Sequence, residues 1–236
     1  MSQALKVLPR CDACCARERC IFGGSSGPEV DGFNRIRRYH LYKARQVIFH
    51  EGTPAVGFHI GCSGRIKLSK ADSNGREQII RIANPGEIIG EEALLDSQPY
   101  GLTAECLEAC HTAFIERGDF LAFLETGQTV GARFLLHFCR TLIETQSRLA
   151  RMGLGDARAR LAGTLLDLAD RYGRPVKGGL QVDLDLTRAE LAALVGLSPE
   201  TAMRLLSEFK SDGLLRLDGR QITVVSREKL GALSAQ

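Results

Sequence analysis

The stretch that most constrains this chain is LTRAELAALVGLSPETAMRLLSEF, residues 186–209. Thr187 and Glu190 have the spacing of a capping box, in which the two side chains satisfy backbone N–H groups at the start of a helix. Gly196 ends that helix at a tight turn, and Ser198 before a proline starts a second helix at once. The stretch therefore predicts two short helices joined by a glycine turn.

Two helices in this order form the helix-turn-helix that reads the major groove of DNA, although an ordinary helical hairpin has the same outline. Residues 214–217 and 221–225 flank an Asp-Gly turn and predict a β-hairpin, which would be a wing beside the helices. We therefore predict a winged helix-turn-helix. The residues expected to face DNA are Thr187, Ser198, Glu200, Thr201, Met203, Arg204 and Lys210.

The whole chain has 236 residues and a formal net charge of +3, which permits nucleic-acid binding without requiring it. No apolar run approaches the roughly 20 residues that a membrane-spanning helix needs. The N-terminus carries arginine and cysteine where a signal peptide has an apolar segment, so we expect a cytoplasmic protein with no membrane partner. In that compartment the eight cysteines are expected to be ligands or redox groups rather than disulfides.

Half of the cysteines lie in PRCDACCARERCIF, residues 9–22. Cys11, Cys14 and Cys20 form a C-x2-C-x5-C pattern, with Cys15 as a further thiol. Thiolates packed this closely suit zinc or an iron–sulfur cluster, and the neighbouring arginines would lower the thiol pKa values. Buried apolar cysteines or a nonspecific thiol cluster are the alternatives. A four-ligand metal centre here requires a further ligand from elsewhere in the chain.

The middle of the chain changes from a β pattern to a helical one. Short β segments separated by glycine-containing turns predict a sandwich or jelly-roll barrel, and the clearest are 46–50, 58–60, 65–69 and 78–83. After Asp119, an apolar stripe with heptad spacing predicts a helix that pairs with a second copy of the chain, unless it lies along its own domain. The members of this stripe are Leu135, Phe138, Leu142, Thr145, Leu149 and Met152.

Together these segments predict an α+β protein, with a glycine-rich flexible joint at 23–27 and a hinge at 153–156. The predicted domains are a cysteine-rich segment (1–30), a β-roll or jelly-roll sensor domain (31–128), a dimerisation helix (129–154) and a winged helix-turn-helix domain (155–236).

This order resembles the CRP/FNR family of bacterial transcription regulators over nearly the whole chain. PGEIIGEEALL at 85–95 is similar to a motif of the family's roll, and residues 186–215 resemble its DNA-binding motif at almost every structural position. The cysteine pattern before the roll resembles the oxygen-sensing FNR branch, in which three N-terminal cysteines and a fourth from the roll hold a [4Fe–4S] cluster. The resemblance implies a homodimer that binds double-stranded DNA and works with RNA polymerase, and not an enzyme.

The resemblance carries over less directly for the fourth cluster ligand. Ala113 stands where the FNR branch has its cysteine, and the nearest thiol, Cys110, lies three residues upstream. Because an odd offset along a strand swaps faces, Cys110 reaches the site only through a bulge or a different approach of the N-terminal segment. Cys106 and Cys62 are the other candidates. The expected ligands are Cys11, Cys14, Cys20 and Cys110.

Two other positions refine the expected partners. The family's nucleotide-binding members grip the cyclic phosphate with an Arg-Ser pair, and residues 98–102 supply no such pair here, so we expect no cyclic nucleotide. Glu200 and Arg204 match the family's base-reading residues, and their chemistry suits cytosine and guanine. We therefore expect an inverted repeat with TGA-type half-sites. Met203 replaces a serine of FNR, which predicts a different preference at the outer base.

The main hypothesis is thus a regulator whose dimerisation and DNA affinity depend on an oxygen-labile cluster. The closest alternative is a family member that senses thiol redox state, nitric oxide or zinc through the same cysteines. A redox enzyme is a different class, and the sequence has no dinucleotide glycine motif after a strand and no P-loop to support it. A DNA-binding protein without a sensory ligand would leave the cysteine segment unexplained.

Overall fold

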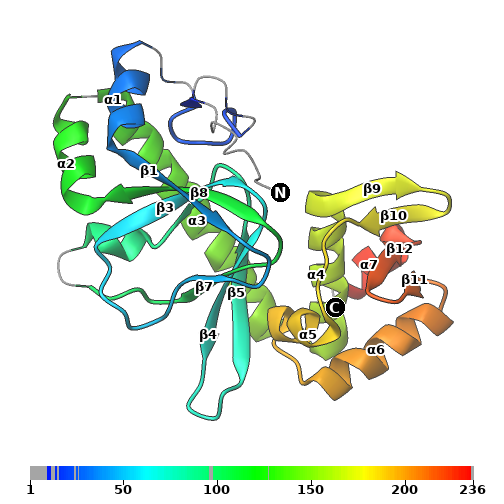
Figure 1. The fold of residues 1–236 in the computed structure, drawn as a ribbon. Helices are drawn as coiled ribbons and strands as arrows, with labels where there is room; N and C mark the ends of the chain where they lie inside the picture. The colour runs from blue at the N-terminus through cyan, green and yellow to red at the C-terminus, as the bar shows by residue number, and fades with distance from the viewer. Residues whose placement is uncertain are drawn as a thin grey trace, which may run out of the picture. The chain divides into compact units, whose positions relative to one another are not determined.

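A computed structural model describes residues 10–234 except 12–13, 15, 24, 26, 96–97 and 127. The chain divides into two compact units (Figure 1). The first comprises Met1–Lys70 with Ile80–Thr141, and the second comprises Ala71–Ile79 with Leu142–Gln236. No helix in the described part of the chain is long and apolar enough to cross a membrane.

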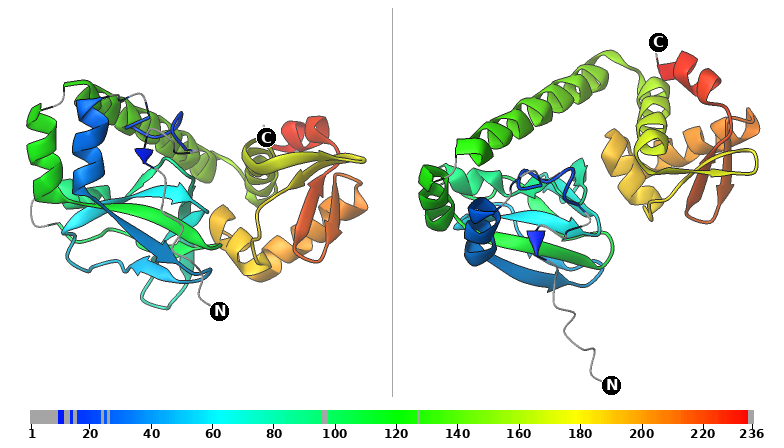
Figure 2. Two further views of the ribbon diagram at one scale, coloured as in Figure 1. Left: turned by 45° about the horizontal axis from the view of Figure 1, so that its top comes forward. Right: turned by 90° about the horizontal axis from the view of Figure 1, so that it is seen from above.

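The first unit is a β-roll made of two four-stranded sheets, with strand orders β1-β8-β3-β6 and β2-β7-β4-β5 (Figures 1 and 2). The strands are β1 (Arg37–Tyr42), β2 (Val47–Phe49), β3 (Gly57–Ser63), β4 (Ile66–Ala71), β5 (Glu77–Ala83), β6 (Ile88–Ile89), β7 (Thr103–Cys106) and β8 (Cys110–Glu116). The helices are α1 (Pro28–Ile36), the short 3-10 helix η2 (Glu91–Leu94), α2 (Arg117–Thr126) and α3 (Gln128–Leu154). Strand β5 and helix α3 each also include residues assigned to the second unit. The predicted β-roll is confirmed.

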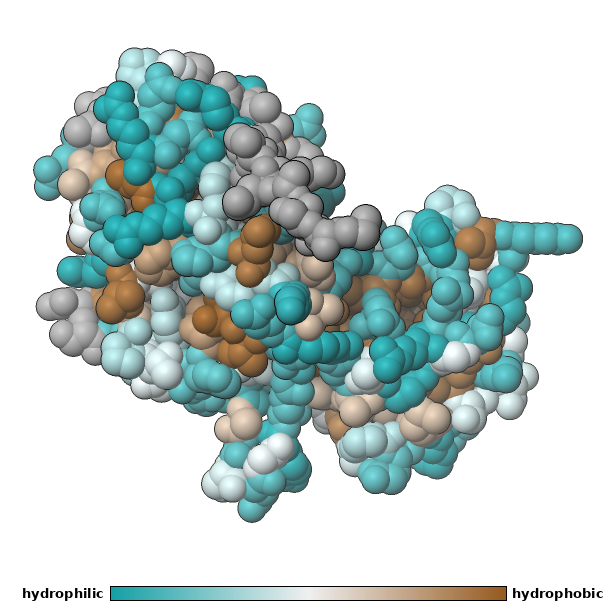
Figure 3. Space-filling model, in the orientation of Figure 1, coloured by the Kyte–Doolittle hydropathy of each residue, from teal (hydrophilic) through white to brown (hydrophobic). Residues whose placement is uncertain are grey.

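The roll has a separate hydrophobic core on each face of the sheet β1-β8-β3-β6. The core between the two sheets contains Phe49, Leu68, Tyr100, Cys106 and Cys110. The core on the outer face joins the sheet to α1, α2, the start of α3 and the cysteine segment. Figure 3 shows apolar side chains as scattered brown patches on a mostly hydrophilic face, as expected when most apolar surface is buried.

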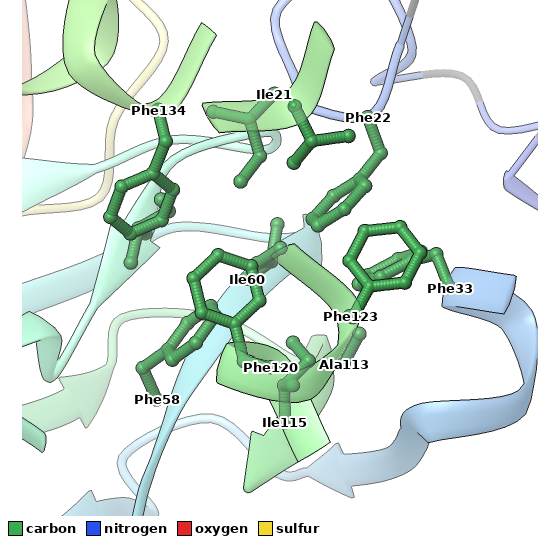
Figure 4. Close-up of a cluster of buried hydrophobic side chains, with 12 residues drawn as sticks. Ile21, Phe22, Phe33, Phe58, Ile60, Ala113, Ile115, Phe120, Phe123 and Phe134 are labelled. Carbon is green, nitrogen blue, oxygen red and sulfur yellow. The ribbon is translucent and has the colours of Figure 1, made fainter. Parts of the chain in front are cut away.

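The outer core consists mainly of aromatic rings (Figure 4). The rings of Phe22, Phe33 and Phe123 gather on one side of Ile60, and those of Phe58, Phe120 and Phe134 gather on the other. The centroids of Phe22 and Phe33 are 3.5 Å apart in a stacked pair, and those of Phe120 and Phe134 are 5.0 Å apart. These contacts join the cysteine segment and α3 to one hydrophobic core.

The second unit has the predicted winged helix-turn-helix. Its helices are α4 (Ala157–Tyr172), α5 (Arg188–Val195), α6 (Pro199–Ser211) and α7 (Arg227–Ser234), and its strands are β9 (Gly173–Val176), β10 (Gly179–Val182), β11 (Leu215–Asp218) and β12 (Gln221–Val224). The strands form one antiparallel sheet in the order β11-β12-β10-β9. The α5–α6 turn uses Gly196 at φ 74°, a left-handed conformation that favours glycine.

Several elements were absent from the sequence predictions. The hairpin of β9 and β10 was not predicted, although the glycines at 178 and 179 mark its turn, with φ 84° and 148°. Helix α1 was not predicted either, although Gly27 followed by Pro28 is a common start of a helix. Within the expected joint at 23–27, Ser25 is buried, at 1% exposed.

A buried imidazole makes the stability of the roll depend on pH. His59 is 6% exposed, and its ring nitrogen Nδ1 lies 3.1 Å from the Thr112 hydroxyl. Burial, with a smaller contribution from the charge of His40, lowers the pKa of His59 from its ordinary 6.5 to about 3. The folded roll therefore holds this imidazole neutral.

We predict that the free energy of unfolding is highest above pH 6.5 and falls as the pH drops from 6.5 toward 3. The unfolded chain takes up a proton at His59 in that window and the folded chain does not, which costs at most about 1.4 kcal/mol per pH unit. Urea denaturation of wild type and His59→Gln at pH 7, 6 and 5 measures this. If the free energy of unfolding changed with pH by the same amount in both proteins, the prediction would be contradicted.

Candidate functional site

The cysteine segment forms a compact loop on the outer face of the sheet β1-β8-β3-β6. Backbone hydrogen bonds from Cys20 to Ala16 (3.0 Å) and from Gly23 to Cys20 (2.8 Å) define its turns. The Arg17 Nε donates to the Gly23 carbonyl at 2.6 Å. A Cβ at Gly23 would lie 1.4 Å from the Arg17 carbonyl oxygen, so this close approach requires glycine. Cys15 lies outside the described residues.

The loop brings four cysteines around one hollow, and its members are Cys11, Cys14, Cys20 and Cys62. The first three are those predicted from the sequence. Phe22, Phe33, Ile60 and Ala113 form apolar walls, and Arg17 and Arg37 add positive charge. The position expected to hold the fourth cysteine in the FNR branch, Ala113, therefore lies at the hollow but carries no sulfur.

Cys62 reaches the hollow from β3, where it lies two residues after Ile60. Residues two apart in a strand share a face, so Cys62 packs against the same outer core as Ile60, which pairs with Ala113 on β8. A β-bulge follows directly, since Gly61 pairs with Thr112 and Ser63 with the adjacent His111. Cys62 therefore lines the hollow together with the N-terminal cysteines.

The structure does not bring Cys110 to this hollow. Cys110 is fully buried in the core between the two sheets, where its thiol donates to the carbonyls of Glu108 (3.3 Å) and Arg65 (3.4 Å). Cys106 lies in the same core and forms a hydrogen bond with Cys110. Strand β8 is continuous from Cys110 to Glu116, so Cys62, and not Cys110, lies at this hollow, and the identity of a fourth ligand stays a prediction.

The hollow favours neutral thiols in the absence of a metal. Burial raises the pKa of Cys20 to about 12, with the neighbouring thiols of Cys11 and Cys14 adding to the rise. Burial likewise raises the pKa of Cys62 to about 12, and Cys14, Cys20 and Cys11 add to it. In both cases the Arg37 charge acts in the opposite direction. A metal centre that binds these sulfurs has to displace their protons.

The junction of α1 and β1 surrounds Cys11 with polar contacts. The Arg37 Nη1 lies 2.8 Å from the Cys11 sulfur, and the Cys11 backbone N–H donates to Asn34 Oδ1 at 3.4 Å. The other amide atom of Asn34, Nδ2, is buried without a hydrogen-bond partner among the described residues. Such donors suit negatively charged sulfur.

The four cysteines line one hollow without converging on a single metal-ion position. Among the residues whose positions are described, no three His, Cys, Asp or Glu side chains are arranged to hold a single metal ion. An iron–sulfur cluster makes a different demand, because each of its four cysteines binds a different iron atom. The donor set of four thiols, the adjacent guanidinium and the unpartnered amide fit such a cluster.

The cysteine loop is connected to the start of α3. Ile21 and Phe22, which directly follow Cys20, share the outer core with Val130 and Phe134 of α3. Ser25 accepts a hydrogen bond from the Arg133 Nη1 of α3 at 3.3 Å. The cysteine loop and this end of the helix therefore share both apolar packing and a hydrogen bond.

The predicted dimerisation stripe lies on α3, and most of it is exposed. Leu135, Leu142 and Leu149 are 65%, 58% and 70% exposed, and Thr145 is also exposed. Phe138 differs, because it packs against the outer core and its ring lies 4.8 Å from that of Phe134. The side chain of Met152 lies outside the described residues. The alternative of a helix lying along its own domain thus describes Phe138 but not the three leucines.

The helix-turn-helix presents the predicted DNA-facing residues. Thr187 and Glu190 form the capping box of α5, and Ser198 caps α6 by accepting from the Thr201 backbone N–H. Glu200 and Arg204 are exposed one turn apart, so their side chains project from one face of α6. Exposed positions also hold Met203 and Lys210, while Thr201 is half-buried.

The two base-reading candidates are charged and oriented on α6. Hydrogen bonds from its own backbone N–H and from the Ser198 hydroxyl hold the pKa of Glu200 below its usual range, so the carboxylate is ready to accept. The Arg204 Nη1 donates to Glu208 at 2.6 Å. This face of α6 therefore offers one acceptor and one forked donor, which is the chemistry that reads cytosine and guanine.

Comparisons with known proteins agree with this architecture. The cyclic nucleotide-binding domain family matches residues 39–127, and the Crp-like helix-turn-helix domain family matches 159–233. A CRP-like cAMP-activated global transcriptional regulator of Mycobacterium tuberculosis is 31% identical over 183 residues, covering 78% of this chain and 82% of that protein. The chain belongs to the CRP/FNR family of transcription regulators.

Other members of the family extend the comparison. The transcriptional activator protein FnrL of Cereibacter sphaeroides is 26% identical over 226 residues, covering 93% of this chain and 89% of that protein. The solved structure of FixK2 from Bradyrhizobium japonicum aligns with a TM-score of 0.72 at 26% identity, over 85% of this chain and 98% of that one. The family assignment makes this chain a DNA-binding regulator.

The region where the family's nucleotide binders carry an Arg-Ser pair has a different lining here. Tyr100 is 5% exposed, stacks on Phe49 with 3.9 Å between ring centroids, and donates its hydroxyl to the Gly57 carbonyl at 2.6 Å. Arg81 on β5 is paired with Glu87 (3.1 Å) and Glu91 (3.4 Å). The expectation that the chain binds no cyclic nucleotide stays a prediction.

Sequence reasoning missed two polar contributors to the cysteine site, Arg37 and Asn34. No motif marks them, because they come from an unpredicted helix and the strand that follows it. Cys62 was a distant candidate, and the glycine pair at 61 and 64 around it was interpreted only as a turn. The available signal was that Cys62 lies two residues after Ile60, at the end of an apolar strand.

We predict that Cys62→Ser loses most of its iron after anaerobic reconstitution with iron and sulfide, because it removes one of four sulfurs around the hollow. Cys110→Ser should retain wild-type iron content, since its thiol faces the other core. Cys139→Ser is the matched control, because this thiol is exposed on α3. The measurement is iron and sulfide per chain. Loss of iron in Cys110→Ser with retention in Cys62→Ser would contradict the assignment.

Proposed function

We propose that this chain is a homodimeric transcription regulator whose dimerisation and DNA affinity are controlled by an oxygen-labile [4Fe–4S] cluster. Cys11, Cys14, Cys20 and Cys62 would hold the cluster. The observation that carries the proposal is the convergence of these four thiols around one hollow that touches the same core as α3. The bound cluster would supply a centre that reacts with oxygen and governs aerobic and anaerobic gene expression.

The residues of the chain supply the connection from the sulfur site to the dimer helix. Phe22 follows the last N-terminal cysteine and is 1% exposed in the core that contains Phe134 of α3. The Ser25–Arg133 hydrogen bond adds a polar contact to the same helix. A loop that is fixed at its cysteines holds Phe22 and Ser25 in place, and these residues hold the first turns of α3.

The rest of α3 is the surface on which a second copy would pack. Leu135, Leu142 and Leu149 repeat every seven residues and are more than half exposed. A heptad stripe that is not buried within its own chain is typical of a helix that pairs with a partner helix. A dimer would also carry two recognition helices, one for each half-site of the operator. Half-sites one turn of DNA apart are separated by about 34 Å.

The recognition helix supports the expected operator. Glu200 can accept from the N4 group of cytosine, and Arg204 can donate to the O6 and N7 of guanine, which suits TGA-type half-sites in an inverted repeat. Met203 is 45% exposed beside Arg204 and offers apolar contact where FNR has a serine. RNA polymerase would be the partner at promoters, and the direction of regulation depends on the operator's position.

The central experiment compares anaerobically reconstituted protein with the same protein after iron is stripped from it. We expect the loaded form to sediment as a dimer and the stripped form to sediment mainly as a monomer. A difference of about 3 kcal/mol in dimer stability changes the dimerisation constant more than a hundredfold. Binding to a duplex with TGA half-sites should weaken in parallel.

Two variants separate dimer formation from cluster binding. Leu149→Asp should weaken the dimer and DNA binding while iron content stays unchanged, because it charges the exposed stripe of α3. Leu41→Asp is the matched control, since Leu41 is 58% exposed on β1 of the roll. Stripped protein that binds the operator as a dimer with unchanged affinity would refute cluster control. Colourless protein holding only zinc would instead favour the zinc-sensing alternative.

Base reading has its own test. Arg204→Ala should weaken binding to the TGA operator by about 1–3 kcal/mol and relax the preference for guanine at the contacted position. Lys210→Ala should weaken binding to all DNA sequences by a similar amount and lower the slope of log affinity against log salt concentration by about one. Fluorescence anisotropy with operators substituted at each base measures both effects. Unchanged base preference in Arg204→Ala would exclude Arg204 as a reader.

A further inference from the structure

We propose that Arg37 is a positioning residue of the cysteine site, whose guanidinium donates to the Cys11 sulfur and balances the negative charge of a bound cluster. This inference rests on the proposed function and deepens it. Arg37 lies outside the cysteine motif, at the first position of β1. Its role follows from its contacts with Cys11 and Tyr39 and from its place in the wall of the hollow.

Two contacts fix the position of the Arg37 guanidinium. Its Nη1 lies 2.8 Å from the Cys11 sulfur, and its central carbon lies 4.2 Å from the centroid of the Tyr39 ring. The planar group is therefore stacked on an aromatic face while its N–H points at sulfur, an arrangement suited to arginine. A lysine keeps the charge at this position but not the planar fork.

The charge of Arg37 reaches beyond Cys11. Arg37 lines the same hollow as Cys20 and Cys62, so one guanidinium lies at the wall of the whole sulfur site. The other arginine in the wall, Arg17, directs its Nε to the Gly23 carbonyl. Arg17 thus contributes to the shape of the loop, and Arg37 contributes a hydrogen bond to sulfur.

Asn34 makes the same corner of the site rich in donors. Its Oδ1 accepts from the Cys11 backbone, and its buried Nδ2 has no acceptor among the described residues. A buried donor without a partner costs free energy unless an acceptor is present. Sulfur atoms of a bound cluster would bring acceptors to this corner.

The consequence is electrostatic. A [4Fe–4S] cluster with four thiolates carries net negative charge, and reduction adds one more electron. Removing a fixed positive charge in a buried site disfavours the more negative state, so the midpoint potential should move to more negative values. A more negative midpoint potential means that the cluster is oxidised more readily. The cluster should therefore be lost faster in air.

The experiment compares wild type, Arg37→Gln, Arg37→Lys and Arg38→Gln after anaerobic reconstitution. We expect Arg37→Gln to lose iron to a chelator about 10-fold faster or more, the order typical of residues that support metal ligands. Its midpoint potential should be more negative than that of wild type. Arg37→Lys should have a midpoint potential close to that of wild type, because it keeps the positive charge. Its rate of iron loss should be intermediate, because it lacks the planar guanidinium that donates to sulfur.

Arg38→Gln is the matched control, because it removes the same charge from the neighbouring residue, which is 61% exposed and paired with Glu116. It should behave as wild type. If wild type holds a cluster and Arg37→Gln matches it in both iron loss and potential, the inference is wrong and the proposed function stands. If wild type takes up no cluster, both fail. Should Arg37→Gln not fold, Arg37→Lys decides, and a wild-type rate of iron loss in that variant overturns the role of the fork.

Discussion

The outer aromatic core of the roll is the interaction on which the other features depend. It joins the sheet, α1, α2, the cysteine loop and the first turns of α3. Burying a phenylalanine stabilises a fold by about 1.5–3 kcal/mol, and a favourable aromatic pair adds about 0.5–1.5 kcal/mol. Phe22 and Phe134 are 1% and 9% exposed, so both elements gain from the same core. The order of the loop and the placement of the helix are therefore energetically linked.

This packing also sets the chemistry of the sulfur site. The apolar surroundings that order the loop raise the pKa of Cys20 and Cys62 to about 12, because a buried thiolate is poorly solvated. A metal that bound these thiols would have to displace their protons, and Arg37, which lies beside Cys11, would then face the negative charge on sulfur.

The fourth thiol at the hollow comes from a different strand than the resemblance implied. Ala113 on β8 and Ile60 on β3 are paired across the sheet, and Cys62 lies two residues after Ile60 on the same face of the sheet. Neighbouring strands can thus both present a side chain at this hollow. Cys110 remains in the core between the sheets.

The sequence by itself determined the elements whose signals are local. The capping box at Thr187 and Glu190, the glycine turn at Gly196 and the start of α6 at Ser198 all depend on residues a few positions apart. The heptad spacing of α3 likewise predicted the exposed leucines. The tertiary structure decided what depends on distant residues: the position of Cys62 at the hollow, the contact of Arg37 with Cys11, and the packing of Phe138 against the outer core. These depend on strand register and on which face of an element meets another, and neither is encoded in the spacing within one segment.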